Sequence, residues 1–508
     1  MTTPQAAEEA FDSFTAALFA ELFDSSSNAP TTGIAEEFAA LYEQATAEML
    51  TGPIVRLFAA LQQAKEEHGV SADRLGFTKE QLAELALKHS AIDEHRVTIG
   101  GRLGRALPIA RAAGARATDY VARKTVEAPS GIELWDEIQE NVAHIKRVLG
   151  MEDEEWNTYA GQLRHAIDSV GVLAEVLDLP EERIAEVTRV TEHYRMRLTP
   201  YYASLIRRGR SDDPVLIQSV PTHEMIDNAG IEIPPVAADH SPARLVDQFY
   251  PRVLAIKATN MCAMYCTHCL RIAHIGRKDR IYPKDAYREA LEYVKGNELI
   301  RDVLVTGGDA LILPNKILRW LLEELDAIDH VRMKRLGTRI PVTSPQRVDT
   351  ELLDILEESN DRKPLRVVTQ VNTAQEITPV SRNAFGQVSK RVSAVLNQAV
   401  LLKGINDTRV KMWKLCETIQ EAYIRPYYIF NCSYRNPQFA HLRVPVETGR
   451  DIVESMYGNI SGDAIPRYIA TAGGKIPLHR SNVVRREGDM IILRKPWSGE
   501  TVEYPDAQ

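Results

Sequence analysis

Residues 257–271 read KATNMCAMYCTHCLR and place Cys262, Cys266 and Cys269 in a C-x3-C-x2-C spacing directly after an apolar run, residues 253–258. Thiolates are the usual ligands of iron–sulfur clusters, and a four-iron cluster held by three cysteines leaves one iron free for a small molecule. A structural zinc site is the alternative, with His268 as the only local fourth ligand. A disulfide framework is not expected in a chain of 508 residues with five cysteines.

Short apolar segments alternate with helical patterns after residue 250. This alternation predicts an α/β fold with a parallel sheet, and six units predict a partial (β/α)6 barrel. The cysteine loop follows the first strand, at the carboxyl ends of the strands, where the active sites of such barrels lie. We expect strands at residues 252–258, 302–306, 339–342, 366–371, 398–402 and 425–430, with helices at 283–295 and 317–328.

The chain is longer than a single hydrophobic core usually becomes, so several domains are expected. Residues 1–130 are predicted to be a helical N-terminal extension, because Phe, Leu and Ala recur there at three- and four-residue spacings. Residues 131–250 are predicted to be a helical section that ends in an extended, proline-rich connector at 209–250. The barrel then occupies residues 251–440, and a C-terminal segment occupies 441–508.

The charge balance excludes one class of function. The net charge is −9, from 61 basic and 70 acidic side chains, which argues against a nucleic-acid surface. No apolar stretch approaches the roughly 20 residues that span a bilayer, so no membrane association is expected. The first residues are acidic where a secretory signal would be basic. We therefore expect a cytoplasmic protein, in a compartment reducing enough for an open iron.

Two further motifs fall on predicted strands. Gly307 and Gly308 end the second strand and precede Asp309. Adjacent glycines let the backbone approach a ligand closely, and the Asp309 carboxylate can accept a hydrogen bond from an ammonium group. A tight turn is the alternative for this motif. Gln398 begins the fifth strand and is either a ligand contact or a surface residue.

Lys475 follows two glycines near the C-terminus, in the sequence AGGKIPL. A lysine whose amine is desolvated by apolar neighbours can form a Schiff base. An exposed lysine in a turn is the alternative.

The cysteine spacing resembles the signature of the radical S-adenosylmethionine (SAM) superfamily. The resemblance implies that the three cysteines hold a 4Fe-4S cluster whose open iron binds SAM, and that an electron from the cluster cleaves SAM to a 5′-deoxyadenosyl radical. It also assigns His268, Gly307, Gly308, Asp309 and Gln398 to the SAM site. His268 stands where that superfamily usually has an aromatic residue.

Seven segments together resemble the lysine 2,3-aminomutase family, which uses both SAM and pyridoxal 5′-phosphate (PLP). They occur in the same order as in the family, from about residue 135 to the end of the chain. The segments are LTPYYASLI at 198–206, CAMYCTHCLR at 262–271, VLVTGGDALIL at 303–313, GTRIPVTSPQRV at 337–348, NQAVLLKGIND at 397–407, RPYYIFNC at 425–432 and AGGKIPL at 472–478.

This resemblance implies an isomerase that moves the α-amino group of an amino acid to its β-carbon. By the same resemblance Lys475 carries PLP, Tyr250 and Arg252 contact PLP, and Arg271 grips the substrate carboxylate. A guanidinium fork matches a carboxylate bidentately, which supports the last assignment. The resemblance further implies an electron donor such as flavodoxin or ferredoxin, and a homo-oligomer.

The chain departs from the lysine-specific members at the substrate side chain. Those members hold the ε-ammonium of lysine with two aspartates, whereas this chain has Ser433 at one position and Ala470 or Thr471 at the other. A buried ammonium without a carboxylate partner costs several kcal/mol, so a substrate other than lysine is expected.

Three cationic side chains near these positions, Arg435, His479 and Arg480, can receive an acidic side chain, as in glutamate 2,3-aminomutases. Surface charges are the alternative for each of them, and a small or uncharged substrate is equally compatible. The family's zinc-binding cysteines find no match, since Thr408 stands where one would be, so we expect no zinc.

Two other functions compete with the aminomutase. One is a radical SAM enzyme of the same family that catalyses another PLP-assisted or PLP-free radical reaction, on an amino acid or a protein side chain. The other is a non-enzymatic iron–sulfur sensor, which would have no use for the Gly-Gly-Asp motif, Gln398 or Arg271.

Overall fold

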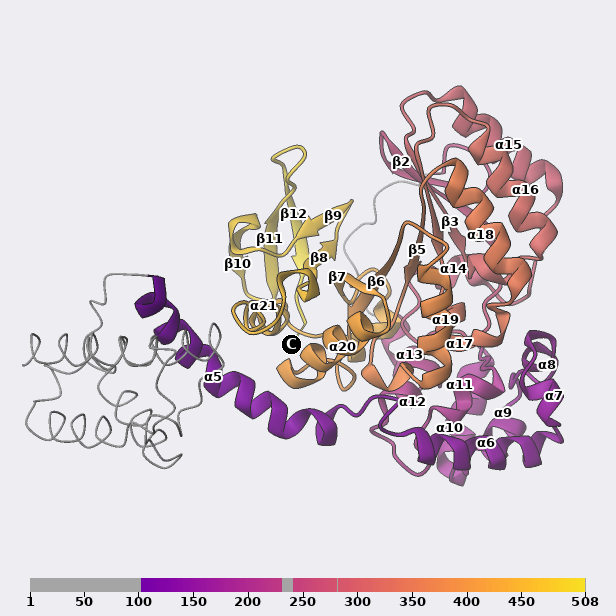
Figure 1. Cartoon of the computed structure of the whole chain (residues 1–508), viewed down its shortest axis with the longest axis horizontal. Helices are drawn as coiled ribbons and strands as arrows, with labels where there is room; N and C mark the ends of the chain where they lie inside the picture. The colour runs from indigo at the N-terminus through magenta and orange to yellow at the C-terminus, as the bar shows by residue number, and fades with distance from the viewer. Residues whose placement is uncertain (1–101, 231–240, 281, 508) are drawn as a thin grey trace, which may run out of the picture. The chain divides into compact units, whose positions relative to one another are not determined.

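The computed structural model describes residues 102–230, 241–280 and 282–507 (Figure 1). The chain divides into two compact units, residues 1–115 and 116–508. Most of the predicted N-terminal extension lies outside the described residues; its described part, α5 (Arg102–Glu127), is helical as expected. No helix in the described ranges is long and apolar enough to cross a membrane.

The section before the barrel is helical, as predicted, but its end differs from the prediction. The segment expected to be an extended connector, residues 209–250, contains two short helices and the first strand. Pro214 occupies the first turn of one of these helices, where the missing N–H of proline leaves no bond unmade, and Asp213 caps it. The elements are α6 (Trp135–Leu149), α7 (Asp153–Trp156), α8 (Tyr159–Arg164), α9 (Val170–Leu177), α10 (Glu181–Thr191), α11 (Pro200–Ser204), α12 (Pro214–Ser219), α13 (Glu224–Asp227) and η2 (Asn228–Gly230).

A nine-stranded sheet in sequential order forms the barrel wall. Strands β2 to β8 run parallel, while β1 and β9 pair antiparallel at the two edges, so the predicted α/β partial barrel is confirmed. The strands are β1 (Val246–Tyr250), β2 (Val253–Thr259), β3 (Asp302–Gly307), β4 (Met333–Gly337), β5 (Leu365–Thr369), β6 (Ala394–Leu401), β7 (Arg425–Asn431), β8 (Arg467–Thr471) and β9 (Lys475–Pro477).

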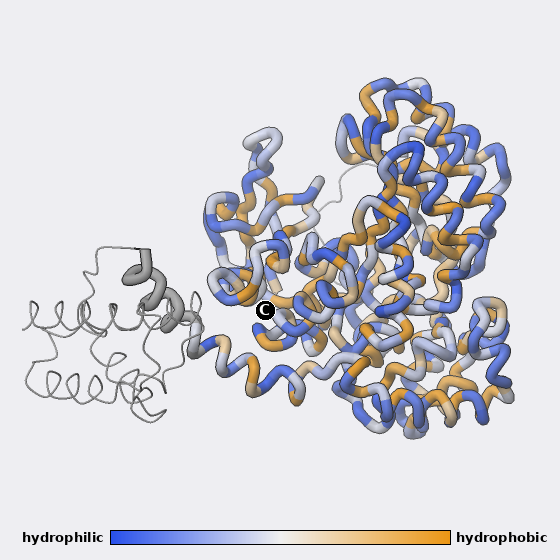
Figure 2. The backbone as a smooth tube through the Cα atoms, viewed as in Figure 1, coloured by the Kyte–Doolittle hydropathy of each residue, from blue (hydrophilic) through white to orange (hydrophobic). Residues whose placement is uncertain are grey.

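Helices cover the outer side of this sheet, and α15, α16, α18 and α19 lie along it in Figure 1. Apolar residues follow the strands and the inner faces of the helices, as the colouring of Figure 2 shows. The helices are α14 (Ile272–Ile275), α15 (Lys284–Gly296), α16 (Asn315–Asp326), α17 (Ile340–Thr343), α18 (Thr350–Arg362), α19 (Pro379–Ser389), α20 (Arg409–Glu421) and α21 (Val446–Glu454). Short 3-10 turns are η3 (Ala310–Ile312), η4 (Pro345–Arg347), η5 (Ala374–Glu376), η6 (Pro437–Leu442), η7 (Gly462–Ala464) and η8 (Arg480–Asn482).

The prediction of a third strand at residues 339–342 was wrong. This segment opens helix α17, with Pro341 in its first turn, and the strand is β4 instead. The prediction missed β4 because it carries two consecutive basic residues, Lys334 and Arg335. Lys334 is fully buried on the helix side of the sheet, where its amine bonds Asp326 of α16 and, at 2.9 Å, the Ser359 carbonyl of α18.

A second, antiparallel sheet closes the chain. It consists of β10 (Val483–Glu487), β11 (Met490–Arg494) and β12 (Thr501–Pro505). Tyr504 of β12 is fully buried, and its hydroxyl donates a hydrogen bond to Asn431 at the end of β7. The small sheet is thereby attached to the barrel strand that precedes β8.

We expect the Lys334→Met variant to unfold at a lower temperature than the parent protein, with a loss of about 3 kcal/mol, because the buried Asp326 carboxylate loses its buried counter-charge and keeps only the half-exposed Arg362 at 3.9 Å. Thermal unfolding followed by circular dichroism measures this loss. The double variant Lys334→Met/Asp326→Leu is the control, and it should be less destabilised because neither charge remains. A double variant that is less stable than the single one would contradict the argument.

Candidate active site

The three cysteines lie together in the loop after β2. Each cysteine is partly buried, and burial together with the neighbouring Cys266 raises the pKa of Cys269 to about 12. Burial, Asp309 and the other two cysteines also raise the pKa of Cys262. A cavity of about 230 Å³ adjoins Cys266 and Cys269. Three thiols that disfavour one another's negative charge in a confined space suit a cationic metal group, so the donor set fits an iron–sulfur cluster.

The Gly-Gly-Asp turn after β3 holds the start of the cysteine loop. The Gly308 N–H donates to the Thr259 carbonyl at 2.5 Å, and the Asp309 N–H donates to the Met261 carbonyl at 2.8 Å. A Cβ on Gly308 would overlap the Met261 backbone, and Gly307 has a φ of +116°. The glycines are therefore required for the contact between the two loops, whatever ligand they also approach.

The buried Asp309 carboxylate joins the ends of β3 and β4. Its Oδ1 accepts hydrogen bonds from the Thr338 hydroxyl at 2.6 Å and the Leu311 N–H at 3.0 Å, and its Oδ2 accepts from the Arg339 N–H at 2.6 Å. A carboxylate has about four acceptor positions, so Oδ2 keeps one for a further donor. The predicted bond to an ammonium group stays a prediction and would use this position.

Arg339 is a site residue that the sequence reasoning missed. Its guanidinium donates to the Cys266 sulfur at 2.8 Å and to Glu376 at 2.5 Å. Gln218 and the Tyr202 hydroxyl accept from the same side chain at 3.2 and 3.3 Å. Arg339 and Tyr202 each lie in one of the seven family-like segments, and this was the signal that could have identified them. The apolar residues around Arg339 indicate a strand, so its role at the site was not predicted.

His268 is buried beside this network. Its Nε2 lies 3.3 Å from the Asn372 amide nitrogen, and its Nδ1 has no partner among the described residues. Burial, with a smaller contribution from Arg339, lowers the pKa of His268 to about 3. The imidazole is therefore neutral at physiological pH.

Lys475 begins β9, immediately after a glycine turn. Its amine lies 4.8 Å from the ring centre of Tyr428 and 5.6 Å from that of Phe430. Burial, followed by the charge of Arg335, lowers the pKa of Lys475 to about 8. The structure thus shows a partly buried amine among aromatic rings and cations, unlike the exposed turn lysine considered as the alternative.

Tyr250 fixes the backbone of this lysine. The Lys475 N–H donates to the Tyr250 hydroxyl at 2.6 Å, and Tyr250 packs edge-to-face on Trp497 with ring centres 6.3 Å apart. Gly474 has a φ of +142°, and a Cβ there would run into the Trp497 ring. Arg252, the other predicted PLP contact, is exposed.

Arg271 links the cysteines to the lysine. It immediately precedes α14 and is partly buried, and its positive charge lowers the pKa of both Cys269 and Lys475. Gln398 lies on β6, paired in register with Tyr428 of β7. Directly paired residues of neighbouring strands share a face, and the Tyr428 ring lies 4.8 Å from the Lys475 amine, so Gln398 is on the side of the sheet that carries Lys475.

The predicted substrate residues separate into two groups. Ser433 is buried after β7, and its hydroxyl accepts the Arg435 N–H at 3.2 Å. Arg435 is partly buried, and its Nε is buried without a hydrogen-bond partner among the described residues. The other two cations are surface groups: His479 bonds Ser481 at 2.8 Å, and Arg480 pairs with Glu454 at 3.1 Å.

Ala470 and Thr471 lie on opposite faces of β8. Thr471 pairs in register with Lys475 and is partly exposed, whereas Ala470 pairs with Ile476 and is fully buried. Neighbouring residues of a strand point to opposite faces, so Thr471 shares the face of Lys475. Of the two residues predicted for this position, Ala470 and Thr471, it is Thr471 that lies on the face of Lys475.

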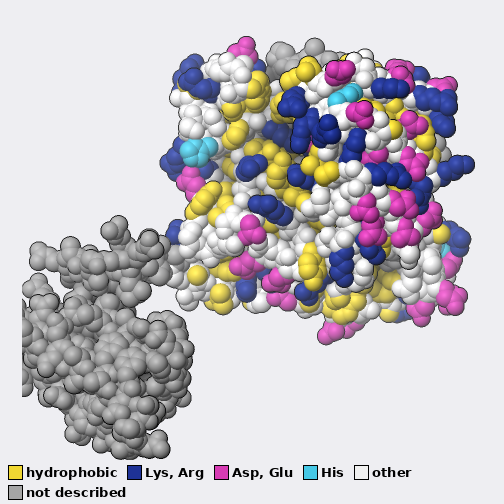
Figure 3. Space-filling model, turned by 45° about the horizontal axis from the view of Figure 1, so that its top comes forward, with side chains coloured by type: hydrophobic (Ala, Val, Ile, Leu, Met, Phe, Trp, Pro, Cys, Tyr) yellow, Lys and Arg dark blue, Asp and Glu magenta, His cyan; other side chains and the backbone are white. Residues whose placement is uncertain are grey.

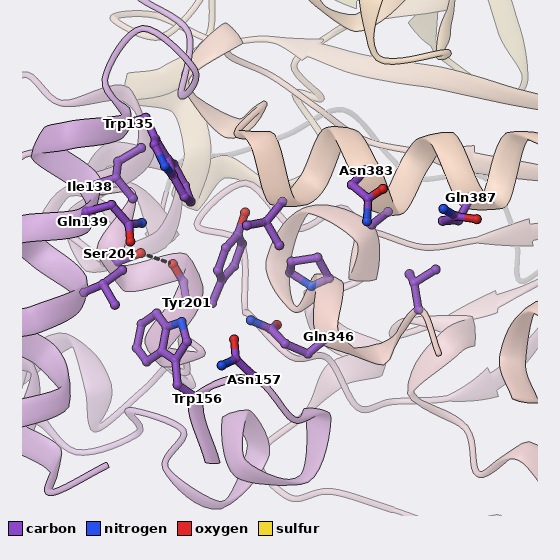
Figure 4. Close-up of a pocket in the computed structure, with 15 residues that line it drawn as sticks. Trp135, Ile138, Gln139, Trp156, Asn157, Tyr201, Ser204, Gln346, Asn383 and Gln387 are labelled. Carbon is purple, nitrogen blue, oxygen red and sulfur yellow. Dashed lines mark hydrogen bonds between the residues drawn. The ribbon is translucent and has the colours of Figure 1, made fainter. Parts of the chain in front are cut away.

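A second cavity, of about 240 Å³, lies between α6, α11 and α19 (Figure 4). Trp135, Trp156 and Tyr201 line it together with several amides, including Gln346 and Asn383. None of the lining side chains is acidic or basic, and none of the predicted site residues belongs to it. It lacks the groups that the predicted chemistry requires.

We expect the Gly308→Ala variant to lose iron and thermal stability, because the added methyl group forces the β3 turn away from the loop that positions Cys262. Iron analysis after anaerobic reconstitution and thermal unfolding together test this. Gly171→Ala is the control, since nothing lies within 4 Å of the place its methyl group would take. Equal iron content in the two variants would contradict the structural role of Gly308.

Comparison with known proteins shows which family the chain resembles. A sequence model of the radical SAM superfamily matches residues 256–411. The glutamate 2,3-aminomutase of Clostridioides difficile is 36% identical over 393 residues, which cover 76% of this chain and 92% of that protein. The L-lysine 2,3-aminomutase of Fusobacterium nucleatum is 36% identical over 361 residues, covering 70% and 84%, and that of Bacillus subtilis is 34% identical over 382 residues, covering 74% and 77%.

Proposed function

The chain belongs to the lysine 2,3-aminomutase family of radical SAM enzymes, and from this premise we propose that it is a PLP-dependent 2,3-aminomutase for an acidic α-amino acid. The family's cofactors are a 4Fe-4S cluster, SAM and PLP. When bound, the cluster and SAM supply a hydrogen-abstracting radical, and PLP holds the migrating nitrogen. The remaining chemistry is positioning, charge compensation and exclusion of water by the protein.

We assign the cluster to Cys262, Cys266 and Cys269, whose shared environment favours a cation. The SAM residues proposed beside it are His268, Gly307, Gly308, Asp309 and Gln398. Asp309 retains one acceptor position, and His268 is neutral, so an ammonium group next to them meets a hydrogen-bond acceptor and no opposing imidazolium charge. Arg339 orients the Cys266 sulfur through its hydrogen bond.

The observation that carries the proposal of PLP dependence is the amine of Lys475. A lysine with a pKa of about 8 is partly neutral near pH 7.5 and is therefore nucleophilic, which an ordinary lysine is not. Tyr250 holds its backbone, and Tyr428 and Phe430 exclude water from its side. Arg271, whose charge lowers the pKa of both this amine and Cys269, is the residue proposed to bind the substrate carboxylate.

The choice of an acidic substrate rests on Arg435. Its Nε is buried and unpaired among the described residues, next to Ser433, where lysine-specific members carry an aspartate. Thr471, on the face of Lys475, is also uncharged. An unpaired cation in this place favours a carboxylate side chain and disfavours an ammonium group. The glutamate 2,3-aminomutase among the relatives is in keeping with this choice.

Borohydride reduction of the PLP-supplied protein, followed by digestion and mass spectrometry, tests the role of Lys475. We expect a phosphopyridoxyl group on the peptide that contains Lys475. Because the deprotonated amine is the nucleophile, the initial rate of PLP attachment should rise with pH through about 8, and not through the 10.5 of an ordinary lysine. An intact cluster without label on Lys475 would refute PLP dependence and leave a PLP-free radical reaction.

We expect the Arg435→Gln variant to raise the KM for L-glutamate by about tenfold, since a charge-assisted hydrogen bond contributes about 1.5–3 kcal/mol. The KM for L-glutamine should change little, because the neutral side chain does not use the charge. Turnover by the anaerobic, reconstituted enzyme measures both values. Arg485→Gln, on the exposed face of β10, is the matched control. Equal changes for the two substrates, or faster turnover of L-lysine than of L-glutamate, would refute the acidic specificity.

The electron donor and the assembly remain predictions. A flavodoxin or ferredoxin would supply the electron, and a homo-oligomer is expected from the family resemblance alone.

A further inference from the structure

Two arginines stand side by side on neighbouring strands of the barrel. Arg335 of β4 and Arg366 of β5 are partners in the parallel register. Their sequence neighbours face the helices: Lys334 and Leu336 on β4, and Leu365 with Val367 on β5, are all fully buried. Because strand residues alternate between faces, both arginines point to the inner side of the curled sheet.

This arrangement leaves positive charge uncompensated. Arg335 donates to the Asp302 carboxylate of β3 at 2.7 Å. No carboxylate in the described ranges pairs with Arg366, and its Nε is buried without a hydrogen-bond partner there. Like charges on directly paired residues of neighbouring strands repel, and an unpaired buried donor costs about 1–3 kcal/mol. The pair is therefore unfavourable for the free protein unless a ligand supplies an anion.

Lys475 lies within range of the same charges. Arg335 is the largest charged influence on the amine, and Asp302 opposes it. Arg271 also lowers the pKa of Lys475, and the strand register places Arg366 directly beside Arg335. Figure 3 shows a hollowed face of the chain in which Lys and Arg side chains gather around hydrophobic ones.

We propose that Arg335 and Arg366 form an anion site that holds a phosphate or carboxylate group of a ligand bound at Lys475. The planar guanidinium forks match the oxygens of either group bidentately, and Asp302 keeps the Arg335 fork in place. The inference rests on the proposed function only in that a ligand occupies Lys475. The two sources of the anion are the phosphate of PLP and the side-chain carboxylate of the substrate; in the second case Arg335 and Arg366 would hold the carboxylate that is otherwise assigned to Arg435.

Binding of inorganic phosphate to the PLP-free protein, with its cluster reconstituted, tests the site directly. Isothermal titration should show binding that Arg366→Gln weakens by at least about tenfold, because a charge-assisted bond is lost. Arg366→Lys keeps the charge without the fork and should be weakened less. Arg288→Gln is the control, since Arg288 is exposed on α15 and pairs with Asp285. Unchanged affinity in Arg366→Gln, or no phosphate binding by the parent protein, would overturn the proposal.

Ligands compared with and without the anionic group then identify the source of the anion. If PLP supplies it, Arg366→Gln weakens PLP binding and leaves pyridoxal, which lacks the phosphate, unchanged. If the substrate supplies it, PLP binding is unchanged and the affinity for L-glutamate falls relative to L-glutamine. Equal losses for charged and uncharged ligands would mean that the substitution only deforms the interior, and would overturn the proposal.

Two features make this test independent of the folding of any one variant and of the proposed function. Arg335→Gln should shift phosphate affinity in the same direction, so the outcome does not depend on the folding of one variant, which circular dichroism and cluster absorbance monitor. Phosphate binding that depends on Arg366, together with no label on Lys475, would refute the proposed function and leave the anion site standing.

Discussion

The close contact between the Gly-Gly-Asp turn and the loop before Cys262 is the constraint on which the rest of the site depends. Two backbone hydrogen bonds join them, and only residues without a Cβ permit that approach. From there Asp309 extends the connection to β4 through Thr338 and Arg339. Arg339 then reaches Glu376, beyond β5, and the Cys266 sulfur. The cysteine loop is thus held by four consecutive strands.

Part of this connection is a buried ion pair. Glu376 is fully buried. Its carboxylate accepts hydrogen bonds from the N–H groups of Asn372 and Thr373 at 2.7 and 3.1 Å, in addition to the one from Arg339. Burying two charges costs desolvation energy, which the Coulomb attraction recovers only when every remaining hydrogen-bonding position is filled. Here most of them are filled, so the pair fixes the direction of the guanidinium more than it adds to stability.

The sequence predicts the architecture well where residue types follow the expected periods. The alternation of apolar strands with helices predicted the parallel sheet, and the cysteine loop was predicted to follow its first strand. The prediction failed at β4, because the charge of Lys334 is neutralised by Asp326 on helix α16. No local sequence pattern reveals this partner. Arg339 was missed because the apolar residues around it indicate a strand and because its partners, Glu376 and Tyr202, are distant in sequence. Ala470 and Thr471 are adjacent in sequence, and only the strand pairing shows that Thr471 shares the face of Lys475.

The bond between Tyr250 and Lys475 has a consequence for how the protein folds. It joins residues 225 positions apart, from the first edge strand of the sheet to the last. Contacts that close so long a loop form late, after the local strand pairs between them. The cysteine loop and its Gly-Gly-Asp partner, by contrast, lie on adjacent strands and can pair early. The support of the cysteine loop therefore needs only short loop closures, whereas the lysine pocket is completed only when the two edges of the sheet have met.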